Sequence, residues 1–277
     1  MKTLKESLLD IDSVQSGIDP IKIIDEWCKE NIKGRYKIDP KTLDIDSNKS
    51  IEITNKELIE FPDYIHFGRV DGAFICWSCE KLTSLEGAPK EVGDYFDCSR
   101  CASLTSLEGA PKEVGGYFSC AYCENLTSLK GAPKEVGGWF DCSSCKNLTS
   151  LEGAPEKVSG HFGCSNCNSL QSLEGAPEKI GGHFECSWCK NLTSLKGVPK
   201  KVSGFFNCAH CNSLTSLEGA PKEVMKYFDC SECDNLTSLK GAPKEVGGPF
   251  YCRGCGKQFT EDDVKKVCNV YNAIMRL

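Results

Sequence analysis

Cysteines recur in this chain as pairs with two residues between them, a spacing that suits metal binding. Twenty cysteines stand among 277 residues, and eighteen of them form nine Cys-x-x-Cys pairs. Eighteen residues separate the pair Cys98 and Cys101 from the pair Cys120 and Cys123, which lies within the range typical of four-cysteine zinc sites. Thiolates from adjacent pairs could hold a zinc ion or an iron–sulfur cluster. A metal-binding or redox-active cysteine array is therefore one hypothesis for the function.

The same cysteines also fit a buried and unreactive role. Free cysteine is among the most buried residue types and packs as a small apolar side chain. Nine pairs are an odd number, so four-cysteine sites would leave one pair unmatched. No pair is followed by the histidine that c-type haem attachment requires. We favour core packing and expect no cofactor, with metal binding and disulfide bonds kept as the alternatives.

The cysteine pairs belong to a repeat of 22 residues. The unit F-x-C-x-x-C-x-x-L-x-S-L-x-G-A-P-x-x-V-G-x-x begins at Phe74 and returns in unbroken register up to Phe250. A fixed period in the twenties predicts a solenoid, in which each unit buries its apolar side against its neighbours. The phenylalanine and the first cysteine are two residues apart, so they share the inner face of a short strand. We expect a β-rich solenoid with a parallel sheet on one face and an irregular or 3₁₀ convex face.

The repeat resembles the leucine-rich repeat. The run Phe118-x-Cys120-x-x-Cys123-x-x-Leu126-x-x-Leu129 is similar to the core L-x-L-x-x-N/C-x-x-L of that family, in the variety with cysteine at the ladder position. Phenylalanine and cysteine stand where two leucines are usual. The phrases LTSLEGAP and KEVGG further resemble leucine-rich-repeat proteins of bacteriophage and prophage origin. This resemblance implies a phage-encoded repeat protein.

Three segments follow from the repeat pattern. Residues 51–258, which the resemblance covers, are expected to form the solenoid, with nine 22-residue repeats and one degenerate repeat that begins at Ile51. Residues 1–50 are expected to form an N-terminal helical cap or docking segment, and residues 259–277 a C-terminal capping helix. A stacked array needs such caps because its terminal core faces would otherwise meet water.

Helix signals support the two caps. Asp19 is a suitable N-cap and Pro20 a suitable first helical residue, and Gly34 stands where that helix would have ended. Thr260 with Asp263 three residues later resembles a capping box. We therefore expect a short capping helix at each end of the solenoid.

Positions that vary between repeats are the candidates for binding. The residue before the phenylalanine points outward and carries a ring in seven repeats: Tyr95, Tyr117, Trp139, His161, His183, Phe205 and Tyr227. The residue after it is mostly small or acidic. A third position, two after the first cysteine, differs in each of seven repeats and includes Arg100, Tyr122 and Trp188. Aromatic residues dominate interface hot spots, which favours a protein-binding surface. The alternative is that stacked rings only stabilise the ladder.

Single histidines and other polar residues bear on two further chemistries, metal or proton binding and catalysis. His161 and His183 hold equivalent places in adjacent repeats, so a two-histidine metal or pH-responsive site is a further hypothesis. Catalysis needs a nucleophile or acid and a base placed once in a pocket, whereas nearly every polar residue here recurs as a ladder. We expect no enzymatic activity.

The net charge and the distribution of apolar residues limit the kinds of partner that we expect. A net charge of −6 offers no basic excess for a phosphate backbone, so we expect no nucleic acid. No run of eighteen apolar residues occurs, so we expect no membrane span, and the first dozen residues lack the apolar stretch of a secretory signal. We expect a non-enzymatic scaffold for protein–protein recognition, in a host-cell cytoplasm or associated with a virion. Its partner and its oligomeric state stay open.

Overall fold

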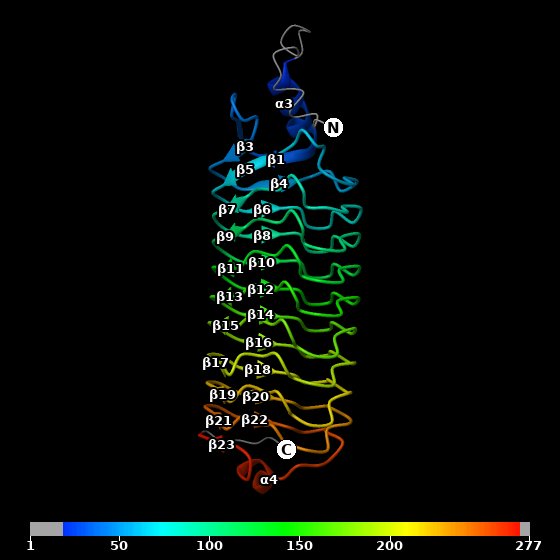
Figure 1. Ribbon diagram of the computed structural model, residues 1–277, viewed down its shortest axis with the longest axis vertical. Coiled ribbons are helices and arrows are strands. Elements are labelled where there is room, and N and C mark those ends of the chain that lie inside the picture. Colours follow the sequence, from blue (N-terminus) through cyan, green and yellow to red (C-terminus); the bar gives the residue numbers. More distant parts are fainter. Residues whose placement is uncertain (1–18, 272–277) are drawn as a thin grey trace.

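The chain winds into one long stack of coils, with one coil for each 22-residue repeat (Figure 1). The computed structural model describes residues 19–271. The outermost parts of the two expected end segments, residues 1–18 and 272–277, lie outside the described residues. The β-solenoid with parallel sheets and small helices near its ends confirms the predicted fold class.

The first face of the stack is an eleven-stranded sheet, called here the first sheet. Its strands are β1 (Ile32–Gly34), β4 (Ile51–Ile53), β6 (Phe74–Ile75), β8 (Phe96–Asp97), β10 (Phe118–Ser119), β12 (Phe140–Asp141), β14 (Phe162–Gly163), β16 (Phe184–Glu185), β18 (Phe206–Asn207), β20 (Phe228–Asp229) and β22 (Phe250–Tyr251). All neighbours are parallel except β1, which runs antiparallel to β4. Phenylalanine faces phenylalanine from coil to coil, and Ile51 of the degenerate repeat takes the place opposite Phe74.

A second row of strands, which the sequence did not indicate, lies beside the first sheet (Figure 1). An eight-stranded part contains β2 (Lys37–Ile38), β3 (Ile45–Ser47), β5 (Phe67–Val70), β7 (Glu91–Val92), β9 (Glu113–Val114), β11 (Glu135–Val136), β13 (Lys157–Val158) and β15 (Lys179–Ile180). A four-stranded part contains β17 (Lys201–Val202), β19 (Glu223–Val224), β21 (Glu245–Val246) and β23 (Asn269–Val270). Within the repeats the charged residue points outward and the valine or isoleucine is buried.

Tight stacking explains the glycines that follow this second row. A Cβ atom on Gly115 would lie 2.2 Å from the carbonyl oxygen of Gly93 in the preceding coil, so a side chain there would clash with backbone. The rest of each coil consists of turns and bends, without a 3₁₀ segment among residues 19–271. The irregular convex side is thus as expected, with two rows of strands instead of one.

The core is a set of parallel columns. The phenylalanines of the repeats are fully buried and stack with ring centroids 4.9 to 5.7 Å apart. Both cysteines, two leucines and the valine or isoleucine of each repeat line the same interior. Because every column continues into the next coil, each repeat is stabilised by its two neighbours.

Both ends combine a helix with added strands. Helix α3 (Pro20–Asn31) begins after Asp19, whose side chain accepts the backbone N–H groups of Ile21 and Lys22, as its sequence predicts. The helix ends at Asn31, so Gly34 lies in strand β1 and not directly after the helix.

The C-terminal end is closed by a shorter helix than expected. Helix α4 (Glu261–Lys265) opens with a capping box between Thr260 and Asp263 and spans five residues. Strand β23 then pairs with β21 and continues the second row. Backbone pairing covers the last coil in addition to the helix.

Candidate functional site

The paired cysteines form a hydrogen-bonded ladder inside the solenoid. Cys98, Cys101, Cys120 and Cys123 are fully buried. The thiol of Cys123 donates to the carbonyl oxygen of Cys98 at 3.2 Å, and the thiol of Cys145 donates to Cys120 in the same way. This bond from the second cysteine to the preceding coil recurs at Cys101, Cys167, Cys189, Cys211, Cys233 and Cys255. The second cysteine of each pair thus links its coil to the backbone of the preceding coil.

The environment of these cysteines favours the protonated thiol. Burial raises the pKa of Cys120 and of Cys142 well above the ordinary value. At Cys255, in the partly exposed last pair, a hydrogen bond with Cys230 lowers the pKa. Thiolates are the metal ligands and nucleophiles. In residues 19–271 every cysteine is a free thiol, and no cluster of three or more His, Cys, Asp or Glu side chains is placed to hold a metal ion.

The predicted rings lie in one column along the outer side of the first sheet. Trp139 has 48% of its surface exposed and His161 is also exposed, whereas Tyr95, Tyr117, His183, Phe205 and Tyr227 are half-buried. Neighbouring rings stack, with centroids 4.4 Å apart for Tyr95 and Tyr117 and 3.8 Å for His183 and Phe205. Within the described chain no ring contact joins Trp139 to His161, so the column has two stacked parts. We call these residues the ring column.

The two histidines form stacked imidazoles whose Nδ1 atoms both accept a backbone N–H group. Their ring centroids are 4.1 Å apart. The backbone N–H of His183 donates to Nδ1 of His161 at 2.9 Å, and the N–H of Phe205 donates to Nδ1 of His183 at 3.1 Å. An acceptor nitrogen must be unprotonated, which fixes the proton of each neutral ring on Nε2. Burial lowers the pKa of His183, and repulsion from His161 lowers it further.

The third variable position holds side chains in an unfavourable backbone conformation. The residue two after the first cysteine has φ between 54° and 63° in eight coils: Ser78, Arg100, Tyr122, Ser144, Asn166, Trp188, His210 and Glu232. For residues other than glycine this left-handed region costs about 1 to 2 kcal/mol. We call these residues the left-handed column. Asn166 and Gly254, two types that tolerate positive φ, are the sequence signal that could have revealed the conformation.

Large side chains of the left-handed column project from the surface. Tyr122 and Trp188 each have 48% of their surface exposed. The guanidinium of Arg100 lies 4.9 Å from the ring centre of Tyr122, and Trp188 stacks on His210 at 3.7 Å. Arg100, Tyr122 and Trp188 lie in the turns that follow the strands of the first sheet, three residues after the outward strand position of their coils.

Carboxylates occupy those strand positions in alternate coils. Asp97, Asp141, Glu185 and Asp229 each follow a buried phenylalanine. Asp141 accepts the backbone N–H of Ser143 at 2.9 Å, and Asp97 and Asp229 make the equivalent bond. Burial raises the pKa of Glu185, with a further contribution from Asp141. The ring column, these carboxylates and the left-handed column together make up what we call the outer face.

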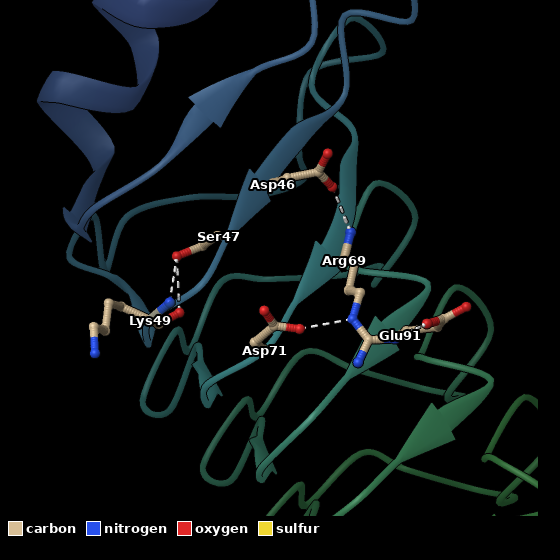
Figure 2. Close-up of polar contacts among 6 residues, drawn as sticks. All are labelled: Asp46, Ser47, Lys49, Arg69, Asp71 and Glu91. Atoms are coloured by element: carbon tan, nitrogen blue, oxygen red, sulfur yellow. Dashed lines mark hydrogen bonds and ion pairs between the residues drawn. The ribbon is translucent and has the colours of Figure 1, made fainter.

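An ion-pair cluster that the sequence did not indicate lies where the N-terminal end meets the regular repeats (Figure 2). Nε of Arg69 donates to Asp71 at 2.7 Å and Nη1 donates to Glu91 at 2.6 Å, while its backbone N–H donates to Asp46. Arg69 lies opposite Glu91 in register, so Arg69-Val70 corresponds to Glu91-Val92 one 22-residue step earlier. This correspondence is the sequence signal from which the Arg69–Glu91 pair could have been predicted. The backbone N–H and the guanidinium of Arg69 are both paired within the chain, so the cluster links β3, β5 and β7.

No helix among residues 19–271 is long and apolar enough to cross a membrane. Comparison of the chain with protein-family models, with curated proteins and with solved structures found no match.

Proposed function

We propose that the protein is a non-enzymatic repeat scaffold that binds a protein partner through its outer face. The left-handed column carries this proposal. Glycine or asparagine would fill the position without strain, yet most coils place a different and often large side chain there, and Tyr122 and Trp188 are half exposed. Local strain of this kind is typical of functional surfaces. Non-repeating side chains at a fixed spacing suit recognition of one specific partner.

The remaining parts of the proposal have narrower support. The LTSLEGAP and KEVGG phrases resemble phage and prophage leucine-rich-repeat proteins, which supports a phage-encoded protein that acts in the host cytoplasm or in the virion. The carboxylates of the outer face favour a protein over a nucleic acid, because phosphates would be repelled. Polar residues recur as ladders along the stack, which favours a scaffold over an enzyme.

The test compares two surface variants as baits. Tyr122→Ser/Trp188→Ser removes two exposed rings from the outer face, whereas Lys112→Ser/Glu113→Ser changes two exposed residues of the second row, Glu113 in strand β9 and Lys112 just before it. Proteins that the unchanged chain retains from a bacterial lysate are identified by mass spectrometry, and the affinity of the purified partner is measured by calorimetry. We expect Tyr122→Ser/Trp188→Ser to weaken binding of the partner by about 1 to 4 kcal/mol in total, with little change in melting temperature.

A third variant separates binding from ladder stability. If the ring column also contacts the partner, Tyr117→Ser weakens binding; if it only supports the ladder, the same change lowers the melting temperature and leaves affinity intact. Phe118→Ala is the control for a core cavity, because its side chain is fully buried. Equal affinity of the partner for the unchanged chain and for Tyr122→Ser/Trp188→Ser would contradict the proposal.

A further inference from the structure

The carboxylates of the outer face follow a period of two repeats. Asp97, Asp141, Glu185 and Asp229 lie 44 residues apart, which is twice the 22-residue unit. The coils between them carry small or neutral residues at the same position, namely Ser119, Gly163 and Asn207. Alternate acidic and uncharged positions therefore run along the axis of the stack.

These four carboxylates lack the counter-charge that many acids elsewhere on the stack have. Elsewhere, lysine and glutamate of adjacent coils pair repeatedly, as in Lys130–Glu108 at 2.9 Å and Lys157–Glu135 at 2.8 Å. Among the described residues no ion pair involves any of the four acids of the outer face. Repulsion between Asp141 and Glu185 contributes to the raised pKa of Glu185, after burial. A row of uncompensated negative charge favours a cationic ligand.

The rings beside the row can contact the rest of such a ligand. Burial raises the pKa of Tyr117 to about 12, with the nearby Asp97 adding to the effect, and Asp229 and Glu185 act in the same way on Tyr227. The ring column thus borders the carboxylates. Trp139, with 48% of its surface exposed, ends the first stack. Exposed aromatic faces can bind cationic side chains and pack against proline rings.

The spacing of the carboxylates selects a backbone conformation. Adjacent strands lie about 4.8 Å apart, so alternate coils lie about 9.6 Å apart. A polyproline II helix advances about 9.3 Å in each turn of three residues, so its side chains at i, i+3 and i+6 share one face at nearly this spacing. A β-strand repeats about every 6.7 Å on one face, and seven residues of α-helix, close to two turns, span about 10.5 Å. Over three intervals the polyproline II spacing drifts by only about 1 Å from that of the carboxylates.

We propose that the outer face binds an extended, basic segment of the partner in the polyproline II conformation, aligned with the axis of the stack and with lysine or arginine at every third residue. Each basic side chain meets one of the four carboxylates, and the residues between pack against the ring column and the small positions at Ser119, Gly163 and Asn207. This inference rests on the proposed function, because it names the chemistry of the partner for the same face.

Three synthetic peptides of identical composition test the spacing. Each contains four lysines and eight prolines. In the first, Pro-Pro-Lys is repeated four times; in the second the lysines occupy alternate residues; in the third they are consecutive. Binding to the intact chain is measured by calorimetry at low salt and at 0.15 M salt. We expect the first peptide to bind roughly fivefold more tightly than the other two, and each affinity to fall as salt rises.

Matched variants locate the contact. Asp141→Asn/Glu185→Gln should weaken the first peptide roughly tenfold, whereas Glu113→Gln/Glu245→Gln removes the same charge from the second row and should leave affinity unchanged. Asparagine at position 141 keeps an acceptor oxygen for Ser143, so the fold is preserved. Circular dichroism melting of each variant checks this.

The outcomes separate this inference from the proposed function. Equal binding of the three peptides, or equal loss in both variants, would overturn the inference, since net charge alone would then explain binding. Failure of all three peptides to bind, while Tyr122→Ser/Trp188→Ser still loses a lysate partner, would overturn the inference and leave the scaffold function standing. If Asp141→Asn/Glu185→Gln still binds the first peptide with full affinity, and Tyr122→Ser/Trp188→Ser still binds the lysate partner with full affinity, both the inference and the proposed function are rejected.

Discussion

At the scale of single residues, the residue type at a repeat position depends on the contacts that its side chain makes with the adjacent coils. A thiol suits the second cysteine position because it is small, uncharged and able to donate one weak hydrogen bond to the preceding coil, as Cys123 does to Cys98. The position two after the first cysteine is different, because Tyr122 and Trp188 there have a positive φ that is unfavourable for their residue types. Within each repeat the positive φ thus falls at this position and not at either cysteine of the pair.

The histidine pair predicts a loss of stability in acid. Folding lowers the pKa of His183 from its ordinary value of 6.5, so the folded chain binds fewer protons than the unfolded chain. Its contribution to stability is therefore complete above about pH 6.5 and is lost as the pH falls below that value. The nearby Lys226 acts in the same direction as His161. Glu185 has a raised pKa and acts in the opposite direction, because its protonation favours the folded state.

Melting curves between pH 7.5 and 5 check this prediction. We expect the melting temperature to fall over this interval in the unchanged chain. The double variant His161→Phe/His183→Phe keeps rings in the column, as Phe205 does in the next coil, and should remove much of the fall. An identical pH profile in the variant would show that these histidines do not set the acid sensitivity.

At the scale of the strand, a strand can be predicted from the sequence only where its alternation of buried and exposed residues is long enough to recognise. The first sheet was predictable because a buried phenylalanine and cysteine two residues apart define an inner face in every repeat. The second row was not, because Glu113–Val114 and its equivalents are two-residue strands between turns, too short for any alternation to be visible. They form because each pairs with the equivalent residues of the adjacent coil, which is a property of the stack. The outer face was predicted by its variability, and its positive φ values were not.

The second row is interrupted between β15 and β17. Gly181 donates to Val158 at 2.9 Å and Met225 to Val202 at 3.0 Å, but the equivalent N–H of Ser203 makes no such bond to Ile180. Three departures from the repeat coincide with this gap: Val198 replaces the usual alanine of Gly-Ala-Pro, Ile180 replaces the usual valine, and Ser203 replaces the usual glycine. Ser159 and Met225 also replace that glycine and keep their bonds to the preceding coil, so the serine alone does not explain the gap. We attribute the gap to the extra volume of Val198 and Ile180, which separates the two coils locally.

Hydrogen–deuterium exchange tests this cause. Val198→Ala should let β17 approach β15 and protect the amide of Ser203, slowing its exchange roughly fivefold, as one hydrogen bond of about 1 kcal/mol would. The reverse change in the preceding coil, Ala176→Val, is the matched control and should reduce protection at Gly181. Unchanged exchange at both amides would show that the side chain before the proline does not set the spacing.

At the scale of the whole molecule, the fold depends only on neighbouring coils. Strand pairs within the regular repeats join residues one repeat apart, as Phe118 with Phe140 and Val114 with Val136. The stability of such an array is close to a sum of repeat and interface contributions. Length is therefore adjustable, whereas the register of the repeat is fixed.

Deletions that keep or break the register give the corresponding prediction. Removing residues 140–161 joins Trp139 to Phe162, so every column of the core continues. We expect a folded solenoid with the same circular dichroism shape, destabilised by about 1 to 3 kcal/mol at roughly 0.05 to 0.15 kcal/mol per residue. The slope of the unfolding free energy against denaturant concentration should fall in proportion to the shorter chain.

Removing only residues 140–150 deletes half as much chain but places Leu151 where a phenylalanine should stack. This second deletion should cost more, because Glu156 and Ser159 then take the inward places of the second cysteine and the next leucine, so polar groups become buried without partners. Equal stability of the two deletion variants in guanidinium unfolding would contradict a nearest-neighbour stack whose register alone specifies the fold.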